Sequence, residues 1–285
     1  MEHHIFAYVF GINRLRFRTD GKGITTLVAF LGCPLSCRYC LNDDCHNNNA
    51  NQQMLSPEQL YEEVKKDHIY FTSTGGGITF GGGEPCLQSS FISRFKEIIP
   101  SEWKLNIETS LNIPLSHVRE LMDIVDTFII DIKDMNPKIY REYTGCSNKQ
   151  VVENLKFLID NNKGDNIIIR VPEILEFNGE HDIYKSVKEL RGLGVKHITF
   201  LTYRTLEELA RIKSAVYGET DDDFDDYGHS LCKVLKEIRN DVACQYKIEY
   251  NSPHCTNRKP CSGTCPVCEK ELEFINQQIS AIVNL

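Results

Sequence analysis

The stretch TTLVAFLGCPLSCRYCLN, residues 25–42, joins a candidate strand to a loop with three cysteines. Cys33, Cys37 and Cys40 follow the spacing C-x3-C-x2-C, and residues 25–31 before them are apolar and rich in β-formers. In parallel α/β folds, ligand sites form at the carboxyl ends of the strands. Tetrahedral zinc and ordinary four-iron clusters take four protein ligands. Three thiolates on a four-iron cluster therefore leave one iron open to a substrate or cofactor.

A fourth protein ligand is also available nearby. Cys45 or His46 could complete the coordination and close a purely structural metal site. From the spacing alone, the open site and the closed site both remain valid interpretations.

The motif GGGITFGGGEP, residues 75–85, places a short strand between two glycine triplets. Glycine permits positive φ angles and lets a ligand approach the backbone closely. Glu84 then stands at the end of the second candidate strand, on the same edge of the sheet as the cysteine loop. A carboxylate beside exposed backbone carbonyls can accept hydrogen bonds from an ammonium group. Alone, the motif fits a tight strand-to-helix turn, but after a three-cysteine loop it favours a binding site.

Short apolar runs alternate with helical patterns along most of the chain. The candidate strands are residues 25–31, 78–80, 104–108, 127–132, 167–171 and 197–203. The candidate helices are residues 57–66, 89–99, 114–124, 151–161 and 182–193, with a further helix beginning near Tyr227. The first helix carries start signals, with Ser56 as N-cap, Pro57 at the first position and Gln59 for a capping box. Six strand–helix units predict an α/β fold with a parallel sheet, an open partial (β/α)6 barrel.

The composition is that of an ordinary globular chain. Of 285 residues, 41% are hydrophobic and 25% charged, and 32 basic and 40 acidic side chains give a net charge of -8. This balance argues against nucleic-acid binding and against a polybasic membrane anchor. No apolar run approaches the roughly 20 residues that span a bilayer. We find no signal-peptide pattern at the start and expect a cytoplasmic protein, whose twelve cysteines favour metal or redox chemistry over disulfides.

The C-terminal part differs from the rest in composition. The stretch HCTNRKPCSGTCPVC, residues 254–268, leads us to divide the chain into a partial barrel, residues 1–250, and a cysteine-rich extension, residues 251–285. Cys255, Cys261, Cys265 and Cys268 are enough to close a metal site, with Cys244 as a substitute ligand. An auxiliary four-iron cluster, a structural zinc ion and thiols used in another way are all compatible with the spacing. Our hypothesis is one additional four-iron cluster.

Five motifs in the chain, read together, resemble those of the radical S-adenosylmethionine (SAM) superfamily. More narrowly, they resemble the activating enzymes of glycyl radical enzymes, the pyruvate formate-lyase activating enzyme group. The motifs, in order, are DGKGITTLVAFLGCPLSCRYCLN (20–42), GGGITFGGGEPCLQ (75–88), NIETSLNIP (106–114), DIKDMNPKIYREYTGCSNKQVVENL (131–155) and IIIRVPEILEFN (167–178). Five motifs in the same order are far more specific than any single one.

The resemblance implies a 4Fe-4S cluster on Cys33, Cys37 and Cys40, with S-adenosyl-L-methionine chelating the fourth iron through its amino and carboxylate groups. The implied cofactor-binding residues are Tyr39, Gly82, Gly83, Glu84, Pro85, Asp131, Lys133 and Arg170. Among them, the glycines, Glu84 and Pro85 would hold the methionyl ammonium. Lys133 would face the carboxylate, and no catalytic side chain beyond the cluster and cofactor is required.

Some family members bind a monovalent cation beside the cofactor carboxylate. The corresponding acids here are Glu108 and Asp131, and Glu108 is one methylene longer than the aspartate of some relatives. The chain also has Arg204 where the family commonly has a histidine, and arginine keeps its charge and cannot be a neutral acceptor. A role for Arg204 is therefore left open. The segment after Leu41 is too short for a ferredoxin-like insert.

The resemblance implies an anaerobic oxidoreductase that cleaves S-adenosyl-L-methionine reductively to a 5'-deoxyadenosyl radical. The radical would abstract hydrogen from a backbone glycine of a partner glycyl radical enzyme, with flavodoxin or ferredoxin as electron donor. Two other functions remain open. The chain could be a radical enzyme repurposed for a small molecule or another peptide, or a non-catalytic iron–sulfur or zinc protein.

Overall fold

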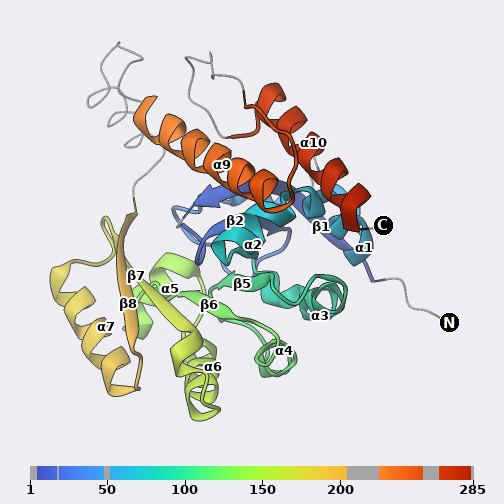
Figure 1. Ribbon diagram of the computed structural model, residues 1–285. Coiled ribbons are helices and arrows are strands. Elements are labelled where there is room, and N and C mark those ends of the chain that lie inside the picture. The colour runs from blue at the N-terminus through green and yellow to red at the C-terminus, as the bar shows by residue number, and fades with distance from the viewer. Residues whose placement is uncertain (1–4, 18, 48–51, 204–224, 253–262, 284–285) are drawn as a thin grey trace.

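The computed structural model describes residues 5–17, 19–47, 52–203, 225–252 and 263–283, with the backbone alone at 203 and 225–230 (Figure 1). In this part of the chain, one eight-stranded sheet has the order β3-β1-β2-β4-β5-β6-β7-β8. The strands are β1 (Ala7–Phe17), β2 (Ile24–Phe30), β3 (Gln53–Leu55), β4 (Gly77–Gly82), β5 (Lys104–Thr109), β6 (Thr127–Asp131), β7 (Ile167–Ile174) and β8 (His197–Tyr203).

The six predicted strands are confirmed as β2 and β4 to β8. Each pairs in parallel with its neighbour, so their carboxyl ends lie along one edge of the sheet. The sheet ends at β3 on one side and β8 on the other, so it is not closed. The α/β fold with a partial barrel is therefore confirmed.

Two strands were missing from the sequence prediction. β1 pairs antiparallel with β2, and the three-residue β3 pairs antiparallel with β1. The pairing of β1 with β2 shifts register twice, and Leu15 has a φ of 57°, in the left-handed region. These irregularities break the period-two pattern that identifies a strand in a sequence.

Helices follow most of the strands. The α-helices are α1 (Pro57–Val64), α2 (His68–Thr74), α3 (Ser89–Ile98), α4 (Leu115–Leu121), α5 (Pro137–Thr144), α6 (Lys149–Asp160), α7 (Glu180–Gly192), α9 (Asp225–Gln245) and α10 (Pro266–Val283). Short 3-10 turns are η1 (Asp43–His46), η2 (Lys65–Asp67), η3 (Pro85–Gln88) and η4 (Gly164–Asn166). The predicted capping box is present at α1, where Ser56 accepts from the Gln59 N–H and Gln59 from the Ser56 N–H. The helices α2 and α5 were not predicted.

Two apolar cores hold these elements. The larger one lies between the sheet and helices α1, α3, α4 and α6, with Phe30, Phe80 and Trp103 among its fully buried side chains. The smaller one joins α2, α9 and α10 to Leu15 and Ile24. Figure 1 shows α9 and α10 beside each other, with α2 and the first strands beneath them. Among the helices described, none combines the length and apolar character that crossing a membrane requires.

Candidate functional site

A pocket opens at the carboxyl ends of the parallel strands. The six parallel strands, β2 and β4 to β8, each contribute a lining residue, directly or through the loop that follows the strand. The lining includes the following residues singled out in the sequence: Cys33, Cys37, Tyr39, Cys40, Gly82, Gly83, Glu108, Asp131, Lys133 and Arg170. Parallel β/α topology explains this gathering, since the strand ends meet at one edge.

The cysteine loop after β2 is held by backbone hydrogen bonds. Ser36 and Arg38 donate their N–H groups to the carbonyls of Thr144 and Tyr143, at the end of α5, over 2.9 and 3.1 Å. Burial raises the pKa of the Cys33 thiol to about 12 and that of Cys37 to about 11. Within the described ranges, no three His, Cys, Asp or Glu side chains are drawn closely enough around one point to hold a single ion. The three motif thiols line one pocket, and thiolates are the ligands that iron–sulfur clusters take.

The structure separates the two candidates for a fourth cluster ligand. His46 is exposed, whereas Cys45 is buried in η1 and its thiol is hydrogen-bonded with that of Cys40. The Cys45 carbonyl accepts the Gly32 N–H over 2.9 Å, which ties η1 to the start of the cysteine loop. Cys45 is not among the pocket-lining residues. A closed metal site would therefore depend on Cys45.

Tyr39 lies in an aromatic group at the rim of the pocket. Its ring makes edge contacts with Tyr143 and Phe177, and its hydroxyl donates to Glu176 over 2.9 Å. These contacts fix the Tyr39 ring beside the third motif cysteine. The Glu176 partner was not anticipated from the sequence.

The glycine pair at the end of β4 is packed against the cysteine loop. The N–H of Gly83 donates to the Phe30 carbonyl over 2.9 Å, and that of Glu84 donates to the Gly32 carbonyl over 2.7 Å. A Cβ at Gly82, whose φ is 88°, would meet Ala29, and one at Gly83 would meet the Gly32 carbonyl. Glycine is therefore required at both positions by close backbone packing.

Glu84 follows the glycine pair, but unlike Gly82 and Gly83 it does not line the pocket. It is 0% exposed. One carboxylate oxygen accepts from the Thr109 hydroxyl over 2.6 Å and the Cys86 N–H over 3.2 Å. The other accepts from the Ser110 N–H over 2.9 Å and its hydroxyl over 2.6 Å. Glu84 thus fastens the glycine turn to the end of β5, a role that the sequence analysis did not anticipate, and its contact with a cofactor stays a prediction.

Four charged side chains also line the pocket: Glu108, Asp131, Lys133 and Arg170. Arg170 donates to Glu108 over 2.6 Å and to the Thr19 carbonyl over 2.7 Å, and Lys133 lies 3.1 Å from Asp131. Burial raises the pKa of Glu108, and the Arg170 charge opposes that rise. Each acid proposed for a monovalent cation thus already has a cationic partner. The cation stays a prediction, and it would compete with both basic side chains.

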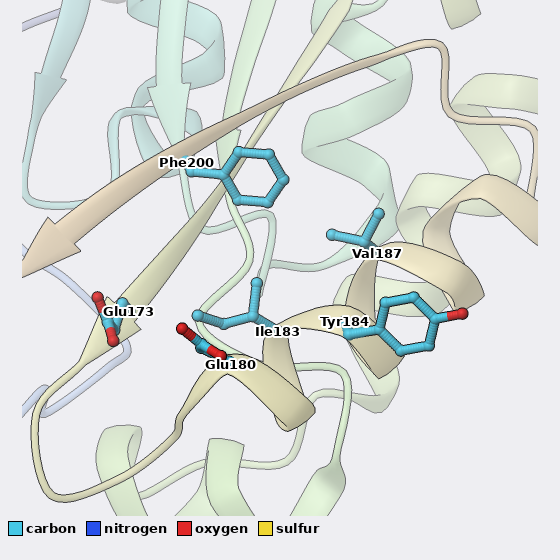
Figure 2. A pocket seen from close by; sticks show the side chains of 6 residues that line it. All are labelled: Glu173, Glu180, Ile183, Tyr184, Val187 and Phe200. Carbon is cyan, nitrogen blue, oxygen red and sulfur yellow. The ribbon is translucent and has the colours of Figure 1, made fainter.

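A second hollow lies on the outer face of the sheet, between β7, β8 and α7 (Figure 2). Ile183, Val187 and Phe200 form its apolar part, with Glu173 and Glu180 nearby. The next residue of β8, Leu201, lines the cysteine pocket on the other face. The lining of the outer hollow has no cysteine, histidine or lysine, whereas the inner pocket has three cysteines and Lys133.

Three predicted residues lie outside the described part of the chain: Arg204, Cys255 and Cys261. The other two tail cysteines are placed. Cys265 precedes α10, and Cys268 is buried in the first turn of that helix. The predicted division at residue 250 is not tested by these positions.

The fold and pocket together define a class: an α/β enzyme whose strand ends gather thiols and paired charges around one cavity. A family model described as the radical SAM superfamily matches residues 27–172, from β2 into β7. The chain belongs to this superfamily and, with the relatives below, to its glycyl radical enzyme activating enzymes. It is accordingly an oxidoreductase whose family chemistry depends on an iron–sulfur cluster and S-adenosyl-L-methionine.

Two curated relatives support the narrower group. The (2S)-3-sulfopropanediol dehydratase activating enzyme of Klebsiella oxytoca is 28% identical over 265 residues, covering 70% of this chain and 83% of that protein. The pyruvate formate-lyase 1-activating enzyme of Escherichia coli strain K12 is 30% identical over 210 residues, covering 70% of this chain and 81% of that protein. Among solved structures, Streptococcus suis SuiB bound to S-adenosylmethionine superposes with a TM-score of 0.50 at 15% identity, covering 79% of this chain and 49% of that one. That likeness concerns the fold alone.

Proposed function

We propose that this chain abstracts a hydrogen atom from a backbone glycine of a partner glycyl radical enzyme. One observation above all supports the proposal: the three motif thiols, Lys133 and Arg170 share a single pocket at the carboxyl ends of an open sheet. The activating enzymes among the relatives make a glycyl radical enzyme the first partner to test.

The residues of the pocket suit the two groups that this activity needs. Cys33, Cys37 and Cys40 would hold the cluster, and the backbone of the Gly82–Gly83 turn and the Lys133 ammonium would hold the two ends of the methionyl group. When bound and reduced by one electron, the cluster and S-adenosyl-L-methionine supply methionine and a 5'-deoxyadenosyl radical. The protein's part is to position these groups and to exclude water.

A protein substrate requires access from the side. Because the described sheet ends at β8, the barrel is partial, and the pocket is lined on that side by Leu201 of this strand. We propose that the glycine-bearing segment of the partner enters along this side. The reaction then takes place in the cytoplasm without oxygen, with flavodoxin or ferredoxin as the electron donor.

The test is an anaerobic assay of the reconstituted chain with dithionite, S-adenosyl-L-methionine and a candidate glycyl radical enzyme. We expect 5'-deoxyadenosine together with an organic radical on the partner, measured by electron paramagnetic resonance. Glycine labelled with deuterium at its α-carbon should transfer deuterium to the 5'-deoxyadenosine.

Each other outcome points to a different function. Cofactor cleavage without a radical on any tested partner would favour an enzyme repurposed for a small molecule or another peptide. Absence of 5'-deoxyadenosine from a protein with a full iron content would leave a non-catalytic iron–sulfur protein. Both results would overturn the proposal.

The first prediction concerns Lys133, whose side chain is 9% exposed and 3.1 Å from Asp131. Lys133→Ala removes this cation from the pocket and leaves Arg170 as a remaining positive charge near the Asp131 carboxylate. We expect the affinity for S-adenosyl-L-methionine to fall about ten-fold, corresponding to roughly 1.4 kcal/mol, while the iron content is unchanged. Equilibrium titration of the reconstituted protein measures both.

Lys138→Ala is the matched control for this experiment. Lys138 lies in the first turn of α5 and is exposed, so its replacement should leave the affinity unchanged. Equal affinities for wild type and Lys133→Ala would show that Lys133 does not contact the cofactor.

A further inference from the structure

The loop between β7 and α7 contacts the cysteine loop through two neighbouring side chains. Glu176 accepts a hydrogen bond from the Tyr39 hydroxyl over 2.9 Å, and the Phe177 ring makes an edge contact with the Tyr39 ring at a centroid distance of 5.8 Å. Tyr39 lines the pocket and directly precedes Cys40 in the sequence. A contact from a distant part of the chain therefore reaches the side chain beside the third motif cysteine.

The backbone of Glu176 has a conformation that glutamate rarely adopts. Its φ is 69°, in the left-handed region, where a residue with a Cβ is disfavoured and glycine or asparagine is usual. Glu176 is exposed, so burial in a core does not account for a glutamate at this position. Disfavoured backbone conformations persist where surrounding contacts hold them, and they are frequent at functional sites. The conformation of Glu176 therefore points to a role of its side chain at the pocket rim.

Asn178 closes this loop through its side chain and its backbone. Its Oδ1 accepts from the Ile174 N–H over 2.6 Å, and its own N–H donates to the Ile174 carbonyl over 3.1 Å. Its amide group donates to the Pro172 carbonyl and to the Asp134 carboxylate, each over 3.1 Å. None of these bonds uses the Glu176 side chain, so removal of that side chain should leave the loop in place.

Tyr39 belongs to a group of three aromatic rings. The rings of Tyr39, Tyr143 and Phe177 make edge contacts with one another, with centroids 5.1 to 6.2 Å apart. Tyr143 is buried, whereas Tyr39 stands on the cysteine loop, outside any helix or strand. The ring contacts restrict the plane of the Tyr39 ring, and the bond to Glu176 restricts the position of its hydroxyl end.

From this arrangement we propose that Glu176 is a positioning residue, which holds the Tyr39 ring at the pocket wall for the binding of S-adenosyl-L-methionine. The inference rests on the proposed function, in which the pocket that Tyr39 lines holds the cofactor. An aromatic ring fixed at this wall offers the cofactor a surface to pack on. Glu176 acts through the Tyr39 hydroxyl and is not itself required to touch the cofactor.

Replacement of Glu176 by glycine separates this role from a purely structural one. Glycine relieves the left-handed backbone conformation but removes the acceptor for the Tyr39 hydroxyl. In Glu176→Gly, the unfolding midpoint of the metal-free chain should therefore not fall below that of wild type. The affinity for S-adenosyl-L-methionine should nevertheless fall about five-fold, which corresponds to roughly 1 kcal/mol, the net contribution of one hydrogen bond. A residue that only stabilised the fold would not lower the affinity without lowering the midpoint.

The test compares the full-length wild type, Glu176→Gly, Glu176→Gln and Lys247→Gly. Titration of the anaerobically reconstituted proteins measures the affinity, and thermal unfolding of the metal-free proteins measures the midpoint. Glu176→Gln keeps an acceptor for the Tyr39 hydroxyl and should bind within about two-fold of wild type. Lys247 follows α9, is exposed and has a φ of 55°, but it does not line the pocket. Lys247→Gly should therefore relieve the same kind of backbone conformation and leave the affinity unchanged.

An affinity of Glu176→Gly equal to that of wild type would overturn the proposal. An equal loss of affinity in Glu176→Gln and Glu176→Gly would also overturn it, because glutamine still accepts from Tyr39.

A double-mutant cycle with Tyr39→Phe tests the contact without the cofactor. Because Tyr39→Phe already lacks the bond, Glu176→Gly should raise the midpoint by about 2 °C more in that background than in wild type. Failure of wild type to bind S-adenosyl-L-methionine would overturn the proposed function and with it the role in cofactor binding. Binding by wild type, with equal midpoint changes in the two backgrounds, would overturn the role of Glu176 alone.

Discussion

Alanine at position 33, 37 or 40 is expected to abolish cleavage of S-adenosyl-L-methionine. Each replacement removes one of three ligands from a cluster that already has one iron without a protein ligand. We expect 5'-deoxyadenosine at background level and a reduced iron content in all three variants. The measurement is anaerobic reconstitution, iron and sulfide analysis, and quantification of 5'-deoxyadenosine under dithionite.

Two other cysteines near the loop provide matched controls. Cys146 donates its thiol to the Pro34 carbonyl over 3.3 Å, and Cys45 is buried beside Cys40. We expect Cys146→Ala and Cys45→Ala to retain the cluster and cofactor cleavage. Full cleavage in one of the motif variants would contradict the assignment of that cysteine, and loss of the cluster in Cys45→Ala would identify Cys45 as a fourth ligand.

The sequence predicts the central fold well because the six parallel strands are short, apolar and separated by helices with recognisable ends. The start of α1 is one example, with Ser56, Pro57 and Gln59 in their predicted roles. The signals for α5 were also present. Asn136 caps it, Pro137 begins it, and Gly145 ends it in the left-handed conformation.

The edge of the sheet was harder to predict for a physical reason. β1 pairs irregularly with β2, so its buried and exposed positions do not alternate, and β3 has only three residues. Neither strand has a local pattern that distinguishes it from a loop. Their existence depends on the long-range partner β2, which a reading of local periodicity does not include.

The sequence motifs identified the residues of the pocket but not the directions of their side chains. Arg170 was named for the cofactor, yet its guanidinium is also paired with Glu108 from a strand two positions away in the sheet. Such pairings arise only when the strands and helices pack.

Glu84→Ala is expected to lower both the stability of the chain and its affinity for S-adenosyl-L-methionine. The buried carboxylate accepts four hydrogen bonds from Cys86, Thr109 and Ser110. Its removal takes the acceptor from the N–H groups of the buried Cys86 and the part-buried Ser110, at a cost of about 1–3 kcal/mol each. We expect a total loss of about 3 kcal/mol, which lowers the midpoint of thermal unfolding by roughly 6–12 °C.

Glu84→Gln keeps the side-chain volume, so it tests whether the loss of stability comes from the charge and the hydrogen-bond acceptors of Glu84. Each carboxylate oxygen faces one backbone N–H, of Cys86 or of Ser110. In either orientation, the amide NH2 of glutamine therefore meets a donor, so the variant should also lose roughly 2 kcal/mol. Glu176→Gln is the control, because Glu176 is exposed and accepts a hydrogen bond from the Tyr39 hydroxyl, which a glutamine oxygen can also accept. The unfolding midpoint of this variant should change little.

Thermal unfolding of the metal-free variants by circular dichroism measures the stability, and titration of the reconstituted proteins at low temperature measures the affinity. Because Glu84 holds the glycine turn that lines the pocket, the affinity should fall even where the variant is fully folded. An unfolding midpoint for Glu84→Gln within a degree of wild type would contradict the fastening role. A lower midpoint with unchanged affinity would show that the turn binds the cofactor without needing the Glu84 anchor, and would leave Glu84 a purely structural part in the fold.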